Sequence, residues 1–305
     1  MIAYYDAHCD TLTRFRDLGS SPATHLDLTR LGQLAPAAAQ VYALWAAPGV
    51  DKPRTFRRLM KRLERQLEKH SDKASLCRSV AEADAAAAAG KVAVFAAVEG
   101  SALLGCSVAG LTEAHRRGIR LVTLCWNRDN KVCGAAFDSG SGLRENGRRF
   151  VEACWNLGVA VDLSHASEQT FWDVLAMASR PVICTHSNAK ALCEHPRNLT
   201  DDQIRAMEER SCLIGLNFAD YFLRDDRNAT FDDLRRHIDR FLDLGAEDCL
   251  ALGSDYDGAE IPPWLDTPEK EAGMYSQLVS AGYPAPLCDK LFFQNALTFF
   301  RNNWN

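Results

Sequence analysis

The sequence of 305 residues lacks a Pro/Gly/Ser-rich linker, and it also lacks any long block of charges of one sign. Because α/β folds of about 250 residues routinely form one domain, the missing linker predicts a single domain over residues 1–305. A net charge of -5 without a charged block argues against nucleic acid and against an anionic membrane surface as partners. Small molecules are therefore the expected ligands, and the sequence leaves a homodimer open.

Cysteine motifs and targeting segments are also missing. The 11 cysteines show no Cys-x-x-Cys spacing and mostly lie inside apolar runs, which is typical of small buried thiols in a reducing compartment. Residues 1–6 lack the basic segment and the apolar core of a signal peptide. The long uncharged stretch 31–50 contains Pro36 and Pro48, so we expect a strand with flanking loops there and not a membrane span. These absences favour a cytoplasmic protein.

Short apolar runs recur along the chain and alternate with amphipathic stretches of helical period. We expect eight strands, at residues 2–7, 40–46, 92–98, 120–125, 159–163, 182–184, 212–217 and 249–253. Helices are expected at about residues 26–31, 52–69, 81–89, 108–117, 147–157, 168–177, 201–209, 231–244, 270–281 and 286–302. Eight strands that alternate with helices predict a closed (β/α)8 barrel of the TIM type. The loop 127–146 is long for a compact domain, which indicates a functional segment.

Residues suited to metal binding and acid–base chemistry stand where five of these strands end. They are His8, Glu99, His165, His186 and Asp255. Because the carboxyl ends of parallel barrel strands meet at one mouth, we expect these side chains to lie together. Asp10 lies two residues after His8 and points to the same face on strand geometry. Since imidazoles and carboxylates are the ligands of catalytic zinc sites, the pattern predicts a metal-dependent hydrolytic site.

These residues also have structural interpretations. A histidine at a strand end is commonly a hydrogen-bonded structural group, and His8 can form such a bond with Asp10. Glu99 can form a salt bridge with a barrel arginine, because an unpaired buried charge costs several kcal/mol or more. Asp255 can serve as a cap or turn residue, which is the preferred interpretation of the nearby Asp257.

Five short motifs follow one another along the chain. They are Asp6-Ala7-His8-Cys9-Asp10, Val98-Glu99-Gly100, Val161-Asp162-Leu163-Ser164-His165, Thr185-His186-Ser187 with Arg197-Asn198, and Gly253-Ser254-Asp255-Tyr256-Asp257-Gly258. In this order they resemble the signature segments of the membrane (renal) dipeptidase family of zinc peptidases. The resemblance extends from about residue 5 to about residue 300. Each motif is short, but the ordered set is specific.

The resemblance implies an amidohydrolase-like barrel that holds two zinc ions. In the implied arrangement, His8 and Asp10 bind one zinc, and His165 and His186 bind the other. Glu99 bridges the two ions. The implied activity is hydrolysis of dipeptides by metal-activated water, with tolerance of a D-residue on the C-terminal side of the cut bond.

The resemblance also implies the residues that act on the substrate. Asp255 takes a proton from water and hands it to the leaving amine. Arg197 binds the substrate's free carboxylate through its planar fork of donors, although it can also be a surface arginine after Pro196. Asn198 and Trp126 complete the implied substrate site. Trp126 stands where many relatives have a histidine, and because an indole offers one N–H donor but no metal bond, the substrate range stays open.

Two other functions compete with a dipeptidase. An N-acyl amino acid amidase or a lactam hydrolase can use the same scaffold, and a required free amine on the substrate would single out dipeptides. A non-catalytic metal-binding protein is the second competitor, and the presence of Asp255, which need not bind metal, argues against it. Residues 299–305 form no apolar tail, so the lipid anchor of the animal relatives is not expected.

Overall fold

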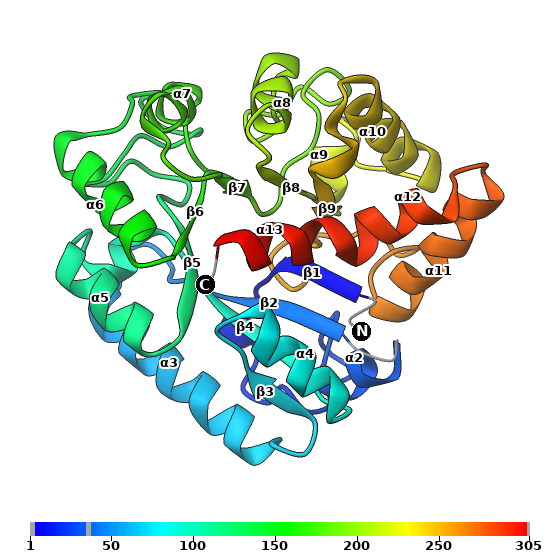
Figure 1. Cartoon of the computed structure of the whole chain (residues 1–305), viewed down its shortest axis with the longest axis horizontal. Helices are drawn as coiled ribbons and strands as arrows, with labels where there is room; N and C mark the ends of the chain where they lie inside the picture. The colour runs from blue at the N-terminus through cyan, green and yellow to red at the C-terminus, as the bar shows by residue number, and fades with distance from the viewer. Residues whose placement is uncertain (1–3, 35–37, 304–305) are drawn as a thin grey trace.

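Eight parallel strands close into a barrel in the computed structural model, which describes residues 4–34 and 38–303 (Figure 1). The strands are β1 (Tyr4–Cys9), β2 (Ala38–Leu44), β4 (Val92–Glu99), β5 (Ile119–Thr123), β6 (Ala160–Asp162), β7 (Ile183–Cys184), β8 (Leu213–Leu216) and β9 (Leu250–Leu252). They pair around the ring in this order, and the pairing of β1 with β9 closes it. The predicted (β/α)8 fold is therefore confirmed, with residues 2 and 3 of the expected first strand outside the described residues.

Helices follow the strands and surround the barrel (Figure 1). They are α1 (Thr11–Arg14), α2 (Leu28–Leu34), α3 (Lys52–Lys69), α4 (Val80–Ala88), α5 (Val108–Arg116), α6 (Glu145–Asn156), α7 (Glu168–Met177), α8 (Asp201–Glu208), α9 (Asp220–Leu223), α10 (Phe231–Asp243), α11 (Pro268–Ser280), α12 (Ala285–Asp289) and α13 (Asn295–Asn303). A π-helical turn, Lys290–Gln294, joins α12 to α13, and 3-10 turns lie at Ser101–Leu104 and Ala246–Asp248. In the described ranges, no helix has the length and apolar character needed to cross a membrane.

A further strand, β3 (Ala74–Leu76), lies outside the ring and is not predicted by the sequence pattern. It pairs with the first residues of β4, from Val92 to Val94. Three residues are too few to show the period-2 alternation that identifies a strand, and the pairing depends on β4 being in place. The short helices α1 and α9 were missed for the same reason, since one helical turn carries no period.

Helix α13 seals the end of the barrel at which the strands begin. Its Phe300 packs against Tyr5 of β1 and Phe95 of β4, with ring centroids 4.9 Å and 6.2 Å apart. Leu297 of the same helix joins this interior cluster. Figure 1 shows α13 crossing the barrel beside β1. With this end closed by side chains, the carboxyl ends of the strands form the mouth that remains for chemistry.

Side-chain caps set where several helices begin after the mouth loops. The Ser167 side chain accepts the Thr170 N–H at the start of α7, and Thr200 and Gln203 form a capping box at the start of α8. Such caps contribute about 1 kcal/mol each. They also fix the ends of the segments that carry the residues of the mouth.

Candidate active site

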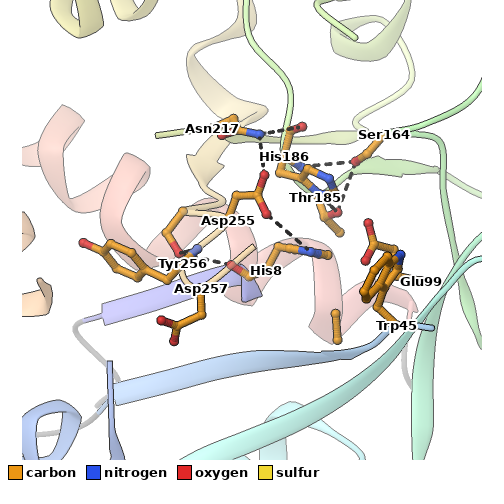
Figure 2. A network of polar contacts seen from close by, with 12 residues as sticks. His8, Trp45, Glu99, Ser164, Thr185, His186, Asn217, Asp255, Tyr256 and Asp257 are labelled. Atoms are coloured by element: carbon orange, nitrogen blue, oxygen red, sulfur yellow. Dashed lines mark hydrogen bonds and ion pairs between the residues drawn. The ribbon is translucent and has the colours of Figure 1, made fainter. Parts of the chain in front are cut away.

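The structure brings together the six residues with ligand-type side chains that were expected at the mouth. Figure 2 labels four of them, His8, Glu99, His186 and Asp255. They are His8 in β1, Asp10 after it, Glu99 at the end of β4, His165 after β6, His186 after β7 and Asp255 after β9. All six are buried. The ligand atoms of His8, Glu99 and His186 lie within 4.8 Å of one another, and so do those of His8, Asp10 and Asp255.

His165 extends this cluster on the side of Glu99. Its Nε2 lies 2.8 Å from Glu99 Oε1 and 3.1 Å from His186 Nε2. The His186 ring lies against His8 with centroids 4.0 Å apart, and His8 Nε2 lies 4.0 Å from Asp255 Oδ1. The six residues therefore form one continuous group of donor atoms.

A bulge in β1 aims His8 at this group. Ala7 belongs to the barrel interior, so strict alternation would turn its neighbour His8 outward. From Asp6 to Cys9, β1 advances three residues while the paired stretch of β2 advances two, and the extra residue is a β-bulge. The bulge returns His8 to the mouth and leaves Cys9 in the cluster packed outside the barrel.

Several donor atoms of the group lack ordinary partners. His8 Nε2, Asp10 Oδ1 and Glu99 Oε2 are buried and find no hydrogen-bond partner among the described residues. Burial and neighbouring carboxylates raise the pKa of Asp10 and of Glu99 well above its usual range. Each unsatisfied buried group costs about 1–3 kcal/mol, and more when it is charged. A divalent cation would pair these atoms and offset their negative charge, so the donor set fits a divalent metal.

The other ring nitrogens of two histidines are held by neighbours. His186 Nδ1 lies 2.8 Å from Thr185 Oγ1, which donates to Asp162 Oδ2 at 2.8 Å. His165 Nδ1 lies 2.8 Å from Asn127 Oδ1. Such outer partners fix the orientation of metal-binding histidines, and here they turn both Nε2 atoms toward the group.

Two buried aspartates, Asp6 and Asp162, tie the strand ends together around the site. Asp162 accepts hydrogen bonds from β5 and from the segments after β6 and β7, whereas Asp6 accepts them from β1, β2 and the segment after β9. The donors are Thr123, Ser164 and Thr185 for Asp162, and His8, Gln40 and Ser254 for Asp6. The sequence reasoning missed these roles. The available signal was a lone aspartate inside an apolar strand, which needs donors nearby.

Asp255 occupies an uncommon backbone conformation with φ of 61°. Residues other than glycine rarely adopt it, and such strain is concentrated at functional sites. Asp255 Oδ2 accepts a hydrogen bond from Asn217 Nδ2 at 3.3 Å. Burial raises the pKa of Asp255 to about 7, while the Arg197 charge and the Asn217 bond act in the opposite direction. A carboxyl group with a pKa near neutrality can both accept and release a proton.

The turn after Asp255 is structural, in agreement with the preferred interpretation of Asp257. Asp257 also has a positive φ, of 63°, and accepts a hydrogen bond from Thr11 Oγ1 at 2.5 Å. A Cβ on Gly258 would lie 2.3 Å from Asp255 Oδ1 and 2.4 Å from Asp10 Oδ2. Glycine is therefore required where the turn approaches both carboxylates.

Arg197 is buried beside the group, so its interpretation as a surface arginine is wrong. Its Nε donates to the Ser164 carbonyl, and one terminal nitrogen lies 2.8 Å from His165 Nδ1. The other terminal nitrogen is buried and unpartnered in the part of the chain that is described. The guanidinium lies over the Phe222 ring, 5.4 Å from its centroid.

The other two residues assigned to the substrate site are Asn198, which follows Arg197 in the chain, and Trp126, which lies near His165. Asn198 donates its amide hydrogens to the carbonyls of Cys193 and Phe222. These bonds hold the loop that carries Arg197. The Trp126 ring lies edge-on to Trp45, with centroids 5.0 Å apart, and 6.3 Å from the His165 ring.

Comparison with known proteins identifies the family. A model of the membrane dipeptidase family, peptidase family M19, matches residues 2–303. The chain belongs to the membrane dipeptidase family. It superposes on the crystal structure of a family M19 metallopeptidase, dipeptidase AC, with a TM-score of 0.92 and 28% identity over 99% of both chains.

The chain is also similar to two other bacterial proteins. A metallopeptidase from Rhodobacter sphaeroides, liganded with a phosphinate mimic of the dipeptide L-Ala-D-Ala, has a TM-score of 0.91 and 27% identity over 99% of both chains. An uncharacterized Klebsiella pneumoniae protein from the pqqA 5' region is 33% identical over 240 residues, which are 75% of this chain and 89% of that protein. Family membership confirms the predicted class, a metal-dependent hydrolase of the dipeptidase type.

Proposed function

We propose that residues 1–305 form one hydrolase domain, a dizinc dipeptidase. The observation that carries this proposal is the continuous group of buried donor atoms at the mouth, within which two sets of three residues have ligand atoms within 4.8 Å of one another. A tetrahedral zinc site uses four ligands, and catalytic sites reserve one of them for water or substrate. With Asp255 reserved for proton transfer, five buried donor residues remain at the mouth, which is more than one ion needs and suits two ions that share a ligand.

In the proposed arrangement, His8 and Asp10 would hold one zinc, and His165 and His186 would hold the other. Glu99 would bridge them, since its Oε1 faces His165 while its Oε2 is buried and unpaired within the described residues. Zinc in such a site lowers the pKa of water and polarises a carbonyl group.

Asp255 is the proposed proton carrier. Asn217 orients its carboxylate, and the positive-φ turn sets it over His8. In this position it would accept a proton from the attacking water and pass it to the leaving amine, as one carboxyl group can do when its pKa is near neutrality. In hydrolysis the oxygen of water would bond to the acyl carbon and the C–N bond would break. One proton of water would move to the leaving nitrogen, and the other would be left with the new carboxyl group.

Arg197 is the proposed anchor for the substrate carboxylate. When His165 uses Nε2 as a ligand, its Nδ1 carries the proton and donates to Asn127 Oδ1, so it cannot also accept from Arg197. Both terminal nitrogens of Arg197 then become available for a bidentate pair with a carboxylate. The bond from Nε to the Ser164 carbonyl keeps the fork in place, and Asn198 would position the loop.

We further propose that the enzyme accepts a D-residue on the C-terminal side and acts in the cytoplasm. The first proposal is supported by the Rhodobacter sphaeroides relative, which was crystallised with a mimic of L-Ala-D-Ala. The second is supported by the eleven cysteines, which are all buried free thiols, as is usual in reducing compartments.

Metal analysis combined with a substrate panel tests the function. Protein purified without chelators should carry close to two zincs per chain and release free amine from L-Ala-L-Ala and L-Ala-D-Ala. N-acetyl-L-Ala-D-Ala is the matched control, because it has the same carboxylate but no free amine. Comparable hydrolysis of the acetylated compound would indicate an acyl amino acid amidase. A saturating content of one zinc per chain would contradict the dizinc assignment.

A further inference from the structure

A cavity of about 170 Å³ adjoins the active site on the side of Glu99. It lies among the segments that follow β2, β4 and β5. Residues lining it include Lys52, Glu99, Gly100, Leu103, Trp126 and Arg128. Since one water needs only about 15 Å³ of such space, the cavity has room for an amino-acid side chain. Glu99 belongs both to the cavity wall and to the donor group, so a side chain in the cavity would branch off next to the reacting bond.

The position of the cavity in the ring indicates which end of a substrate it faces. In the strand order of the barrel, β4 lies across from β8. Arg197 and Asp255, which would hold the carboxylate and the leaving amine, follow β7 and β9 on the far side. The cavity therefore lies on the side of the N-terminal residue of the dipeptide. This step rests on the proposed function.

The cavity wall carries two cations, Lys52 and Arg128, and two acidic residues, Glu99 and Asp129. Lys52 is half-buried, and its Nζ donates to the carbonyls of Ala46 and Ala47, which hold the ammonium group over the cavity. Arg128 is 76% exposed at the entrance, and its nearest acid, Asp138, is 4.0 Å away. Such a long, exposed ion pair contributes little and leaves the guanidinium free to meet a ligand.

Both acidic residues of the cavity wall are engaged elsewhere. Glu99 Oε1 lies 2.8 Å from His165 Nε2, and Asp129 is held by its own loop. Its Oδ1 accepts the Ala135 N–H, and its Oδ2 accepts hydrogen bonds from Ser139, Ser141 and Arg144. The carboxylate is thus bound into the loop of residues 135–144. Among the described residues, neither cavity carboxylate forms an ion pair with Lys52 or Arg128.

We propose that this cavity receives the side chain of the substrate's N-terminal residue, and that Lys52 and Arg128 select an acidic side chain there. Leu103 and Trp126 would pack on its methylene groups, and the two cations would meet its carboxylate. Trp126 is braced by its edge-on contact with Trp45, so this wall keeps its shape.

A series of dipeptides that differ in charge at the N-terminal residue tests this assignment. L-Glu-L-Ala and L-Gln-L-Ala have nearly the same shape, and L-Lys-L-Ala reverses the charge. We expect kcat/KM to fall in the order Glu, Gln, Lys, with a Glu/Gln ratio of about fivefold or more from two partly exposed cations. In Lys52→Met/Arg128→Gln, the Glu/Gln ratio should approach one. Arg57→Gln, which removes an exposed cation of α3 outside the cavity, is the control and should keep the wild-type ratio.

The ratio of two substrates on one protein cancels differences in folded fraction and metal content. Two results would overturn the cavity assignment while leaving the dipeptidase function intact. In the first, the wild-type protein cleaves all three dipeptides with a Glu/Gln ratio of kcat/KM near one. In the second, the double substitution leaves the wild-type ratio unchanged. If the wild-type protein cleaves none of these three dipeptides and does not cleave L-Ala-D-Ala, the proposed dipeptidase function is refuted, and the cavity assignment fails with it.

Discussion

Replacing Arg197 by methionine tests the proposed carboxylate site. Both terminal nitrogens of Arg197 would bond to the substrate, and a hydrogen bond to a charged group contributes about 1.5–3 kcal/mol. Two such bonds set an upper limit of about 6 kcal/mol. The two bonds act on one carboxylate, and water can enter the truncated site. We therefore expect Arg197→Met to lose about 3 kcal/mol of transition-state stabilisation. This loss corresponds to roughly 10²-fold in kcat/KM for a dipeptide.

Two comparisons separate binding from damage to the fold. Arg197→Met keeps an apolar stem near Phe222 but loses the bond to the Ser164 carbonyl, and a thermal melt records that structural cost. Arg197→Lys keeps the charge without the planar fork and should recover only part of the activity. The decisive assay compares L-Ala-D-Ala with its C-terminal amide. Wild type should discriminate strongly between the two and Arg197→Met only weakly, whereas equal losses on both substrates would refute the reasoning.

Three other changes are expected to separate metal binding, proton transfer and stability. Glu99→Ala should lower bound zinc below two per chain by mass spectrometry, and an unchanged content would contradict a bridging role. Asp255→Asn should keep zinc and melting temperature while kcat falls by roughly 10²–10⁴, so near wild-type turnover would exclude it as the proton carrier. Buried His237 accepts the Ala189 N–H and donates to the Leu223 carbonyl, and burial lowers its pKa to about 4. In the unfolded chain the His237 imidazole binds a proton near pH 6.5, whereas in the folded protein it stays neutral down to about pH 4. Up to about 3 kcal/mol of the free energy of unfolding should therefore be lost as the pH falls from 6.5 to 4. Denaturant melts of His237→Gln should lack this part of the acid dependence.

The ring of strands could be predicted because each strand is a compact apolar run that stands apart from its neighbouring helices. Helix α3 matches its expected range of 52–69, since Asp51 caps it and Pro53 stands in its first turn. Helix α7 matches 168–177, with Ser167 as its cap. Local chemistry alone sets these boundaries, so the sequence displays them.

Features that depend on distant partners could not be predicted in the same way. The bulge that turns His8 inward exists only relative to β2, and β3 exists only beside β4. The ligand-type residues were found because each stands at the end of a strand or just after it. The roles of Asp6 and Asp162 were missed because these residues act through hydrogen bonds across the ring. Burial of Arg197 likewise depends on a long loop whose course no local pattern specifies.

The closure of the barrel makes the order of synthesis matter. β1 is synthesised first, but its partner strand β9 is synthesised last among the strands. Tyr5 of β1 also packs against Phe300 of α13, which is synthesised later still. Until both arrive from the ribosome, the nascent chain exposes an unpaired parallel edge and an uncovered aromatic interior, a state prone to aggregation. We expect folding to be slow and largely post-translational, because its closing contacts join the most distant segments. His8 and Asp255 meet through that same closure, so hydrolytic competence would arise in one late step.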